Sequence, residues 1–271
     1  TLTNLRPVSN PLFPDEPSYR SGNFALVFPM QDPETGEKAA VKCFTRQQQD
    51  RATRYEAISR YLKANPNPYF VPYDFLTDEL WADDSDHPVL RMDWVEGETL
   101  GQHLQKRCEA EDTTALQRLY DRFREMALWL HLQPLAHGDI KPDNVMVRPN
   151  GTLALVDYDG LFVPELQGER PTEAGTPPFT HPKRNAQHFD RHLDDFSLLL
   201  HLTALRALSL QPSLYASFCN EDRLFFSTDD LQDLRNSEAM RQLLLLFDDP
   251  LTKLLAHLRM VGANRMENRT I

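Results

Sequence analysis

Two short apolar runs on either side of Asn150-Gly151 constrain the fold most strongly. They lie in the segment "NVMVRPNGTLALVDYDG" (144–160). An Asn-Gly pair between two strand-like runs predicts a β-hairpin with a tight turn. Asn144 opens the first run and Asp157 follows the second. Because an antiparallel hairpin returns the chain to its starting point, we expect Asn144 and Asp157 to lie close together in space.

The segment directly before this hairpin, "HGDIKPD" (137–143), adds Asp139 and Lys141 to the same end. Mg²⁺ takes hard oxygen ligands and usually only one or two from the protein. We therefore predict Asn144 and Asp157 as Mg²⁺ ligands, Asp139 as a base and Lys141 as a neutralising cation. Phosphoryl transfer needs this combination, because its catalysis is mostly positioning and charge stabilisation. Taken singly, each residue is better explained by a polar loop that caps a hairpin, and it is their combination that favours the chemical role.

The N-terminal third of the chain has the composition of a small antiparallel sheet. Residues 1–18 are rich in Pro, Asn and Ser and indicate an extended lead-in. Strands are expected at 24–28, 38–44, 69–76 and 87–95, and one helix is expected at 47–63. A turn signal of Pro, Asp and Gly separates the first two strands, which predicts a hairpin.

The composition becomes helical after Gly97. Apolar residues in 114–132 recur at helical spacing and predict one amphipathic helix. Leu-rich helical segments dominate from Asp194 onward. The predicted organisation is a lead-in (1–18), a β-rich N-lobe with one helix (19–95) and a larger, mainly helical C-lobe (96–271).

The overall composition excludes several classes of protein. A net charge of −11 over 271 residues argues against a general nucleic-acid binder, which needs a basic face. The apolar-rich stretch 196–210 is shorter than the roughly 20 residues that a membrane span requires, and it contains His201 and Arg206. Three widely spaced cysteines without a CxxC pair favour free thiols in a reducing compartment. No signal peptide is visible, and we expect a cytoplasmic location.

The motifs together resemble those of a eukaryotic-type Ser/Thr protein kinase domain over residues 19–265. "HGDIKPDN" is similar to the HRDxKxxN catalytic loop, and "VDYDG" is similar to the DFG segment, with Tyr158 for Phe and Asp159 for Gly. This resemblance implies an α+β, bilobal protein-kinase-like fold, with ATP and Mg²⁺ as cofactors. The HGD loop and the degenerate glycine loop suggest a divergent, bacterial rather than animal, kinase.

The resemblance also assigns roles in the N-lobe. "AAVK" (39–42) resembles the VAIK strand, so that Lys42 would bind the nucleotide phosphates and Ala40 would touch adenine. Glu56 is the only Glu in the following helix and would be the ion-pair partner of Lys42. "RSGNFALV" (20–27) occupies the glycine-rich loop position. Only Gly22 of that loop matches, and Val27 would also contact the nucleotide.

Further positions match the hinge region. "MDWVEGETL" (92–100) would place Met92 as the gatekeeper and the backbones of Asp93 and Val95 against adenine. Met146 would lie under the adenine ring. Ordinary core packing is the alternative interpretation for both methionines.

The C-lobe matches the family at supporting positions as well. "AGTPPFTHP" (174–182) resembles the end of an activation segment, in which Thr176 would bridge Asp139 and Lys141. "DDFSLLL" (194–200) resembles the helix whose first Asp, here Asp194, holds the catalytic-loop backbone, although an N-cap role is the plain alternative. His137 is expected to pack below Tyr158.

Two departures from the family pattern bear on regulation. Lys183 stands where kinases have a Glu that pairs with a late Arg, here Arg265. Two cations cannot make that bond, so the C-lobe must be held together differently. Gly138 replaces the Arg that reads a phosphate on the activation segment. Activation by such a phosphate is therefore not expected.

The resemblance implies ATP-dependent transfer to Ser/Thr hydroxyls of a protein substrate or regulated partner, with Asp139 as the base. A pseudokinase that serves as a nucleotide-binding or scaffold module is the alternative, favoured by the poor glycine loop. A small-molecule kinase of the aminoglycoside or choline type, which often has HGD, is a second alternative. Lys141 argues against it, because those families usually lack this Lys.

Overall fold

The computed structural model describes residues 2–22, 25–45, 50–82, 84–220 and 222–263. The chain forms two units, an N-terminal unit (Thr1–Glu96) and a C-terminal unit (Gly97–Ile271), which are described separately. The expected strand at 24–28 and the expected helix at 47–63 both begin at positions outside the described residues.

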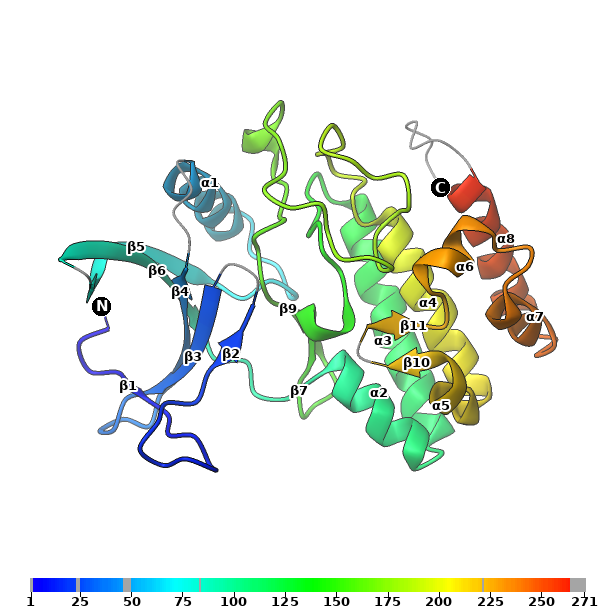
Figure 1. Ribbon diagram of the computed structural model, residues 1–271, viewed down its shortest axis with the longest axis horizontal. Coiled ribbons are helices and arrows are strands. Elements are labelled where there is room, and N and C mark those ends of the chain that lie inside the picture. The colour runs from blue at the N-terminus through cyan, green and yellow to red at the C-terminus, as the bar shows by residue number, and fades with distance from the viewer. Residues whose placement is uncertain (1, 23–24, 46–49, 83, 221, 264–271) are drawn as a thin grey trace. The chain divides into compact units, whose positions relative to one another are not determined.

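In the described part of the N-terminal unit, one antiparallel sheet carries one helix (Figure 1). Its elements are β1 (Arg6–Pro7), β2 (Arg20–Ser21), β3 (Ala25–Gln31), β4 (Lys38–Phe44), α1 (Arg51–Ala64), β5 (Tyr73–Ala82) and β6 (Ser85–Asp93). The strand order is β1-β3-β4-β6-β5, and β2 also pairs with β3. Asp32 shapes the β3–β4 turn, because its carboxylate accepts the backbone N–H groups of Glu34 and Thr35.

Aromatic side chains attach α1 to this sheet. The ring of Tyr55 stacks on that of Phe75 at 5.5 Å between centroids and meets Tyr73 edge to face. The Tyr73 hydroxyl donates to the Tyr55 carbonyl at 2.6 Å, so the contact is both apolar and hydrogen-bonded. Phe44 at the end of β4 completes the cluster. Such pairs contribute about 0.5–1.5 kcal/mol beyond the area they bury, which fixes the helix against β4 and β5.

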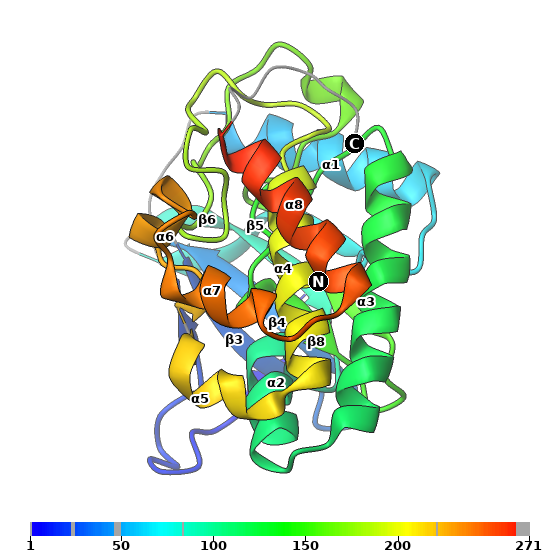
Figure 2. The same cartoon turned by 90° about the vertical axis from the view of Figure 1, so that its right-hand side faces the viewer.

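The C-terminal unit is mainly helical (Figure 2). Its helices are α2 (Leu100–Glu109), α3 (Thr113–Leu132), α4 (Asp195–Leu210), α5 (Tyr215–Phe218), α6 (Thr228–Gln232), α7 (Glu238–Leu244) and α8 (Asp249–Ala263). Its short strands are β7 (Glu98–Thr99), β8 (Val145–Val147), β9 (Leu153–Leu155), β10 (Cys219–Asn220) and β11 (Arg223–Leu224). Caps define two helix starts: Thr99 forms a capping box with Gln102, and Asp112 accepts the backbone N–H of Ala115.

The core of this unit lies around α4, which contacts both α3 and α8. The expected apolar face of α3 is buried at Leu116, Leu119, Tyr120, Phe123, Met126, Ala127 and Leu130. Arg206 of α4 adds a polar link, because its guanidinium makes two hydrogen bonds to Asp248, at 3.0 and 2.6 Å, and a third to Gln117. A sheet-rich N-terminal unit and a helical C-terminal unit confirm the predicted fold class. No helix in the described ranges is long and apolar enough to cross a membrane.

Candidate active site

The predicted hairpin forms between β8 and β9 and brings its two polar ends together. Residues Val145–Val147 pair in antiparallel register with Leu153–Leu155, and all six are buried. The turn has Gly151 at φ +80°. At the open end the backbone N–H of Val156 donates to the Asn144 carbonyl at 3.0 Å. This bond places Asp157, the next residue, beside Asn144.

Asp139 lies at the centre of a hydrogen-bonded cluster. Its Oδ1 accepts the backbone N–H of Thr176 at 2.7 Å, and its Oδ2 accepts the Thr176 hydroxyl at 3.2 Å. Lys141 Nζ lies 3.5 Å from Asp139 Oδ2 and donates to Thr176 Oγ1 at 3.3 Å. The structure therefore brings together three residues from two segments that are 35 positions apart, and the activation-segment resemblance predicted this same bridge.

Asn144 is oriented by Asp139, and this decides which of its atoms is available to a ligand. Its Nδ2 donates to the Asp139 carbonyl at 2.9 Å and to Asp139 Oδ2 at 3.1 Å. Its Oδ1 has no hydrogen-bond partner among the residues the structure describes. Asp157 adopts φ +68°, a left-handed conformation that is uncommon outside glycine. One oriented amide oxygen and one carboxylate are a donor set that fits Mg²⁺.

Asp194 fixes the catalytic-loop backbone. The N–H groups of His137 and Gly138 donate to its two carboxylate oxygens at 2.5 and 2.8 Å. Burial raises the pKa of Asp194, and the nearby His137, the two amide donors and Arg184 oppose that shift. Asp194 also precedes α4, but its side chain makes no cap hydrogen bond. Asp194 is thus the N-cap residue of α4 by position, but its carboxylate binds the loop and does not cap the helix.

His137 and Tyr158 pack against each other below the loop. Their rings meet edge to face at 6.2 Å, and the Tyr158 hydroxyl donates to the Leu155 carbonyl at 2.9 Å. A ring nitrogen of His137 lies 2.9 Å from the Val156 carbonyl, next to Asp157. Both side chains are almost fully buried, so this contact supports the hairpin end from beneath.

Gly138 explains the missing catalytic-loop arginine. Its φ is +84°, and a Cβ at this position would lie 2.1 Å from the Gly160 carbonyl oxygen. Real Cβ contacts essentially never fall below 3.0 Å. Neither an Arg nor any other side chain fits here unless the backbone moves.

His181 connects the activation segment to α8, a role that the sequence did not reveal. The Lys183 backbone N–H donates to His181 Nδ1 at 3.0 Å, so Nε2 carries the proton and donates to the Val261 carbonyl at 3.1 Å. Burial lowers the pKa of His181, which keeps it neutral. The expected counterpart of Lys183, Arg265, lies outside the described residues. His181 and Val261 lie 80 positions apart in the sequence, so no local pattern predicts their contact.

Four predicted nucleotide-binding residues share one face of the N-terminal sheet. Val27 is opposite Lys42 in the β3–β4 register, and Ala40 is opposite Met92 in the β4–β6 register. Cross-strand partners point to the same face, as do residues two apart on one strand. Val27, Ala40, Lys42 and Met92 therefore form one surface. Phe75, which packs against α1, lies on this face too, through its pairing with Leu90.

The other predicted contacts are backbone positions or core residues. The Gly22 N–H donates to the Ala25 carbonyl at 2.9 Å, which closes the described part of the β2–β3 connection. Asp93 ends β6, and Val95 follows it in the segment that leads out of the N-terminal unit. Met146 is buried on β8 between Thr99 and Ala154.

Glu56 does not form the predicted ion pair in this structure. It is exposed on α1, and it has no hydrogen bond or ion pair among the described residues. The buried face of α1 consists instead of Arg51, Arg54, Tyr55, Ala57, Ile58 and Leu62. Glu56 was predicted as the partner of Lys42 because it is the only Glu in this segment. Residue type alone does not determine which face of the helix the position occupies.

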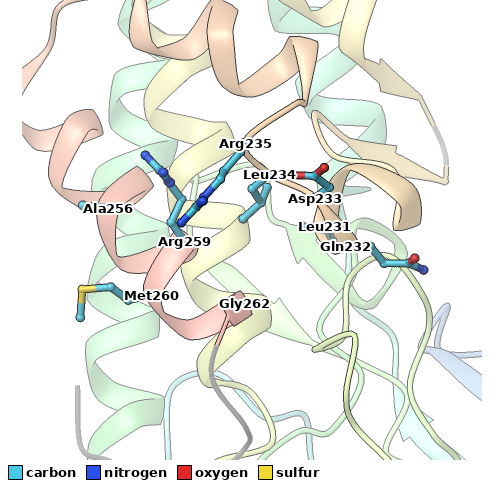
Figure 3. Close-up of a pocket in the computed structure, with 9 residues that line it drawn as sticks. All are labelled: Leu231, Gln232, Asp233, Leu234, Arg235, Ala256, Arg259, Met260 and Gly262. Carbon is cyan, nitrogen blue, oxygen red and sulfur yellow. The ribbon is translucent and has the colours of Figure 1, made fainter.

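A surface hollow elsewhere in the C-terminal unit contains none of the predicted residues (Figure 3). It has a volume of about 650 Å³ and lies between the segment 231–235 and the end of α8. Arg235 and Arg259 are its cations and Asp233 is its carboxylate. None of Asp139, Lys141, Asn144 and Asp157 lines this hollow. Within the described chain, no group of three or more His, Cys, Asp or Glu could hold a metal ion.

Comparison with known proteins now adds to the geometry. Residues 20–227 match the family model described as the protein kinase domain. The chain is 24% identical over 246 residues to the rat interferon-induced, double-stranded RNA-activated protein kinase, covering 86% of this chain and 48% of that protein. It is 25% identical over 178 residues to an Aurora kinase of Yarrowia lipolytica, and the match covers 65% of this chain and 47% of that protein. It is 30% identical over 168 residues to mouse serine/threonine-protein kinase 32C, and the match covers 60% of this chain and 33% of that protein.

The chain thus spans less than half the length of each of these relatives. They come from a yeast and from rodents, and they give no support to the expected bacterial likeness. The matched region covers both the sheet that carries Lys42 and the loop that carries Asp139. The chain belongs to the protein kinase family.

Proposed function

We propose that this domain transfers the γ-phosphoryl group of ATP to a Ser or Thr hydroxyl of a protein substrate. The observation that carries the proposal is the cluster around Asp139, which contains Thr176, Lys141 and Asn144 in direct hydrogen-bond or ion-pair contact. A base, a cation and an oriented amide within one cluster suit phosphoryl transfer, which depends on positioning and charge stabilisation.

Each residue of this cluster then has a distinct role. Asp139 orients the substrate hydroxyl and accepts its proton, because its carboxylate is the only acidic group in contact with both Thr176 and Lys141 among the described residues. Lys141 lies 3.5 Å from that carboxylate and neutralises charge on the phosphoryl group during transfer. Thr176 keeps Asp139 and Lys141 at this separation, and Asp194 holds the loop that carries them.

Asn144 and Asp157 would hold Mg²⁺. The ion neutralises the charge of the nucleotide phosphates. Asp139 prepares Asn144 for this role, because it uses both amide hydrogens and leaves the oxygen available. In the N-terminal unit, Lys42 would bind the nucleotide phosphates, and Val27, Ala40 and Met92 would contact adenine from the face that they share with Lys42.

Glu56 supports a second candidate function, that of a pseudokinase. An exposed Glu56 does not supply the carboxylate that the family pairs with Lys42, and the described glycine loop keeps only Gly22 of the family pattern. A domain in this state would bind nucleotide without transferring phosphate and would serve as a scaffold for a partner protein. The contacts of Asp139 nevertheless favour the active enzyme, because a pure scaffold does not require them.

Radiolabel transfer from [γ-³²P]ATP separates the two candidates. The wild type should label Ser/Thr-containing protein in the presence of Mg²⁺, and chelation of the metal should abolish labelling. Asp139→Asn should bind ATP with wild-type affinity in a thermal-shift assay and lose transfer by about 10²–10⁴-fold. ATP binding without transfer in the wild type would favour the pseudokinase. Phosphorylation of amino-alcohol or sugar acceptors, and not of protein, would favour a small-molecule kinase.

Two broader features are part of the same proposal. The net charge of −11 favours a protein substrate over a nucleic acid. The three cysteines, Cys43, Cys108 and Cys219, are free thiols. Free thiols are typical of the reducing cytoplasm, where ATP is also available.

A further inference from the structure

The guanidinium of Arg184 contacts the catalytic loop from the far end of the activation segment. Its Nη1 donates to the Gly138 carbonyl at 2.6 Å and to Thr180 Oγ1 at 3.4 Å. The first bond is short and involves a charged donor, the stronger class of hydrogen bond. It joins residues 46 positions apart, one of which directly precedes Asp139.

The rest of the guanidinium is poorly satisfied. Nε and Nη2 of Arg184 are buried and have no hydrogen-bond partner among the described residues. Burial lowers the pKa of Arg184, while the carboxylates of Asp194, Asp139, Glu173 and Asp190 act in the opposite direction. Buried donors without partners destabilise a fold and need an explanation. Stability alone does not account for a cation at this position.

Glycines make room for this contact on two sides. A Cβ at Gly175 would lie 2.8 Å from Arg184 Nη1 and 3.2 Å from the Gly138 carbonyl oxygen. Gly138 itself has no space for a side chain, because the Gly160 carbonyl lies against it. Gly138, Gly160 and Gly175 belong to the catalytic loop, the "DYDG" segment and the activation segment. The backbones of all three segments meet where the Arg184 side chain arrives.

We infer that Arg184 is a positioning residue that holds the catalytic loop and the activation segment together, in place of a phosphate on that segment. Gly138 stands where the family pattern has the arginine that binds such a phosphate. Arg184 supplies a permanent cation to the same loop from within the segment. Thr176, which contacts Asp139, lies between Gly175 and the residues that lead to Arg184. Fixing Arg184 therefore fixes the segment that carries Thr176.

The test compares the wild type with Arg184→Ala, Arg184→Lys and Arg241→Ala. Arg241 is an exposed arginine paired with Glu238 at 2.6 Å, so its replacement controls for the loss of a surface cation. The kinetic part rests on the proposed function, whereas amide hydrogen exchange of residues 137–139 and 174–176 does not. Arg184→Lys keeps the charge and provides a second variant if Arg184→Ala fails to fold.

Arg184→Ala should raise exchange in both segments and lower kcat by about 10–100-fold, because small misplacements at a reacting centre have effects of this size. The KM for ATP should stay within about twofold, as expected when an interaction specific to the transition state is lost. Arg184→Lys should be intermediate, and Arg241→Ala should match the wild type. Phosphatase treatment of the wild type should leave kcat unchanged.

Unchanged exchange in Arg184→Ala would overturn the inference, because the contact would then hold neither segment. A wild type that loses activity with phosphatase and regains it on rephosphorylation would overturn it too. If the wild type transfers no phosphate to any protein substrate, the proposed function fails. Hydrogen exchange alone then decides whether Arg184 positions the two segments.

Discussion

Adding one methyl group at Gly138 should destabilise the protein far more than adding it at Gly151. Both glycines have nearly the same left-handed backbone, φ +84° and φ +80°. At Gly151 no neighbouring atom lies within 4 Å of the point that a methyl carbon would occupy, whereas at Gly138 that point is 2.1 Å from the Gly160 carbonyl oxygen. The pair of Ala variants therefore separates the backbone cost from the packing cost.

The magnitudes follow from the two environments. A left-handed residue with a Cβ costs roughly 1–2 kcal/mol, and this cost applies to both variants. At Gly138 the backbone must also move by about 0.9 Å to reach the 3.0 Å limit. Overpacking of this kind costs about 1–3 kcal/mol. Weakening the Gly138 bond to the Asp194 carboxylate adds about 1.5–3 kcal/mol. We expect Gly138→Ala to be about 3–5 kcal/mol less stable than Gly151→Ala.

Urea unfolding followed by tryptophan fluorescence measures this difference, provided that the two variants share the same m-value. Loss of folded protein in Gly138→Ala, together with a cooperative transition in Gly151→Ala, agrees with the reasoning. A difference below about 1 kcal/mol would refute it, since the overlap with Gly160 would then be relieved at no cost. Gly138→Arg, which restores the family pattern, should behave like Gly138→Ala and lose activity.

Three further results are expected. Asp194→Asn should cost about 2 kcal/mol of unfolding free energy, because its amide group can accept only one of the two backbone N–H groups now held by the carboxylate; an unchanged denaturation midpoint would contradict this. Thr176→Val keeps the backbone bond to Asp139 but loses the hydroxyl between Asp139 and Lys141, so kcat should fall about tenfold with stability changed by less than about 1 kcal/mol; a wild-type kcat would exclude a role for the hydroxyl. Burial lowers the pKa of His201 from 6.5 to about 4, so the unfolded chain binds a proton that the folded chain does not bind until about pH 4. The unfolding free energy should therefore fall by about 3 kcal/mol as the pH drops from 6.5 to 4, as measured by urea titrations over a pH series. His201→Phe should remove most of this pH dependence. An equal pH dependence in both proteins would assign the effect to other groups.

Local patterns predicted the parts of the site that are built from neighbouring residues. The Asn150-Gly151 turn determined the β8–β9 hairpin, and the hairpin in turn places Asn144 next to Asp157. The apolar spacing of 114–132 likewise identified the buried face of α3. In each case the interaction that decides the structure lies within about 20 residues of sequence, the range over which a pattern is informative.

Orientation and long-range contacts were beyond such patterns. Glu56 was selected by residue type, yet α1 turns its aromatic and arginine positions to the sheet and leaves Glu56 exposed. No local pattern singles out His181, whose bond to the Val261 carbonyl places it between the activation segment and α8. Arg184 gave no signal at all, because its partner is a backbone carbonyl that any residue type could supply.

The Asp194 contact has a consequence for how the domain is made. The residue that fixes the His137 backbone follows it by 57 positions, and the bond from His181 reaches 80 positions further along the chain to α8. During synthesis the catalytic loop therefore leaves the ribosome well before the residues that hold it, and contacts of this range form slowly because loop closure must come first. A nascent chain released before α4 would have Asp139 without its framework, so catalytic competence should appear only once nearly the whole domain has been translated.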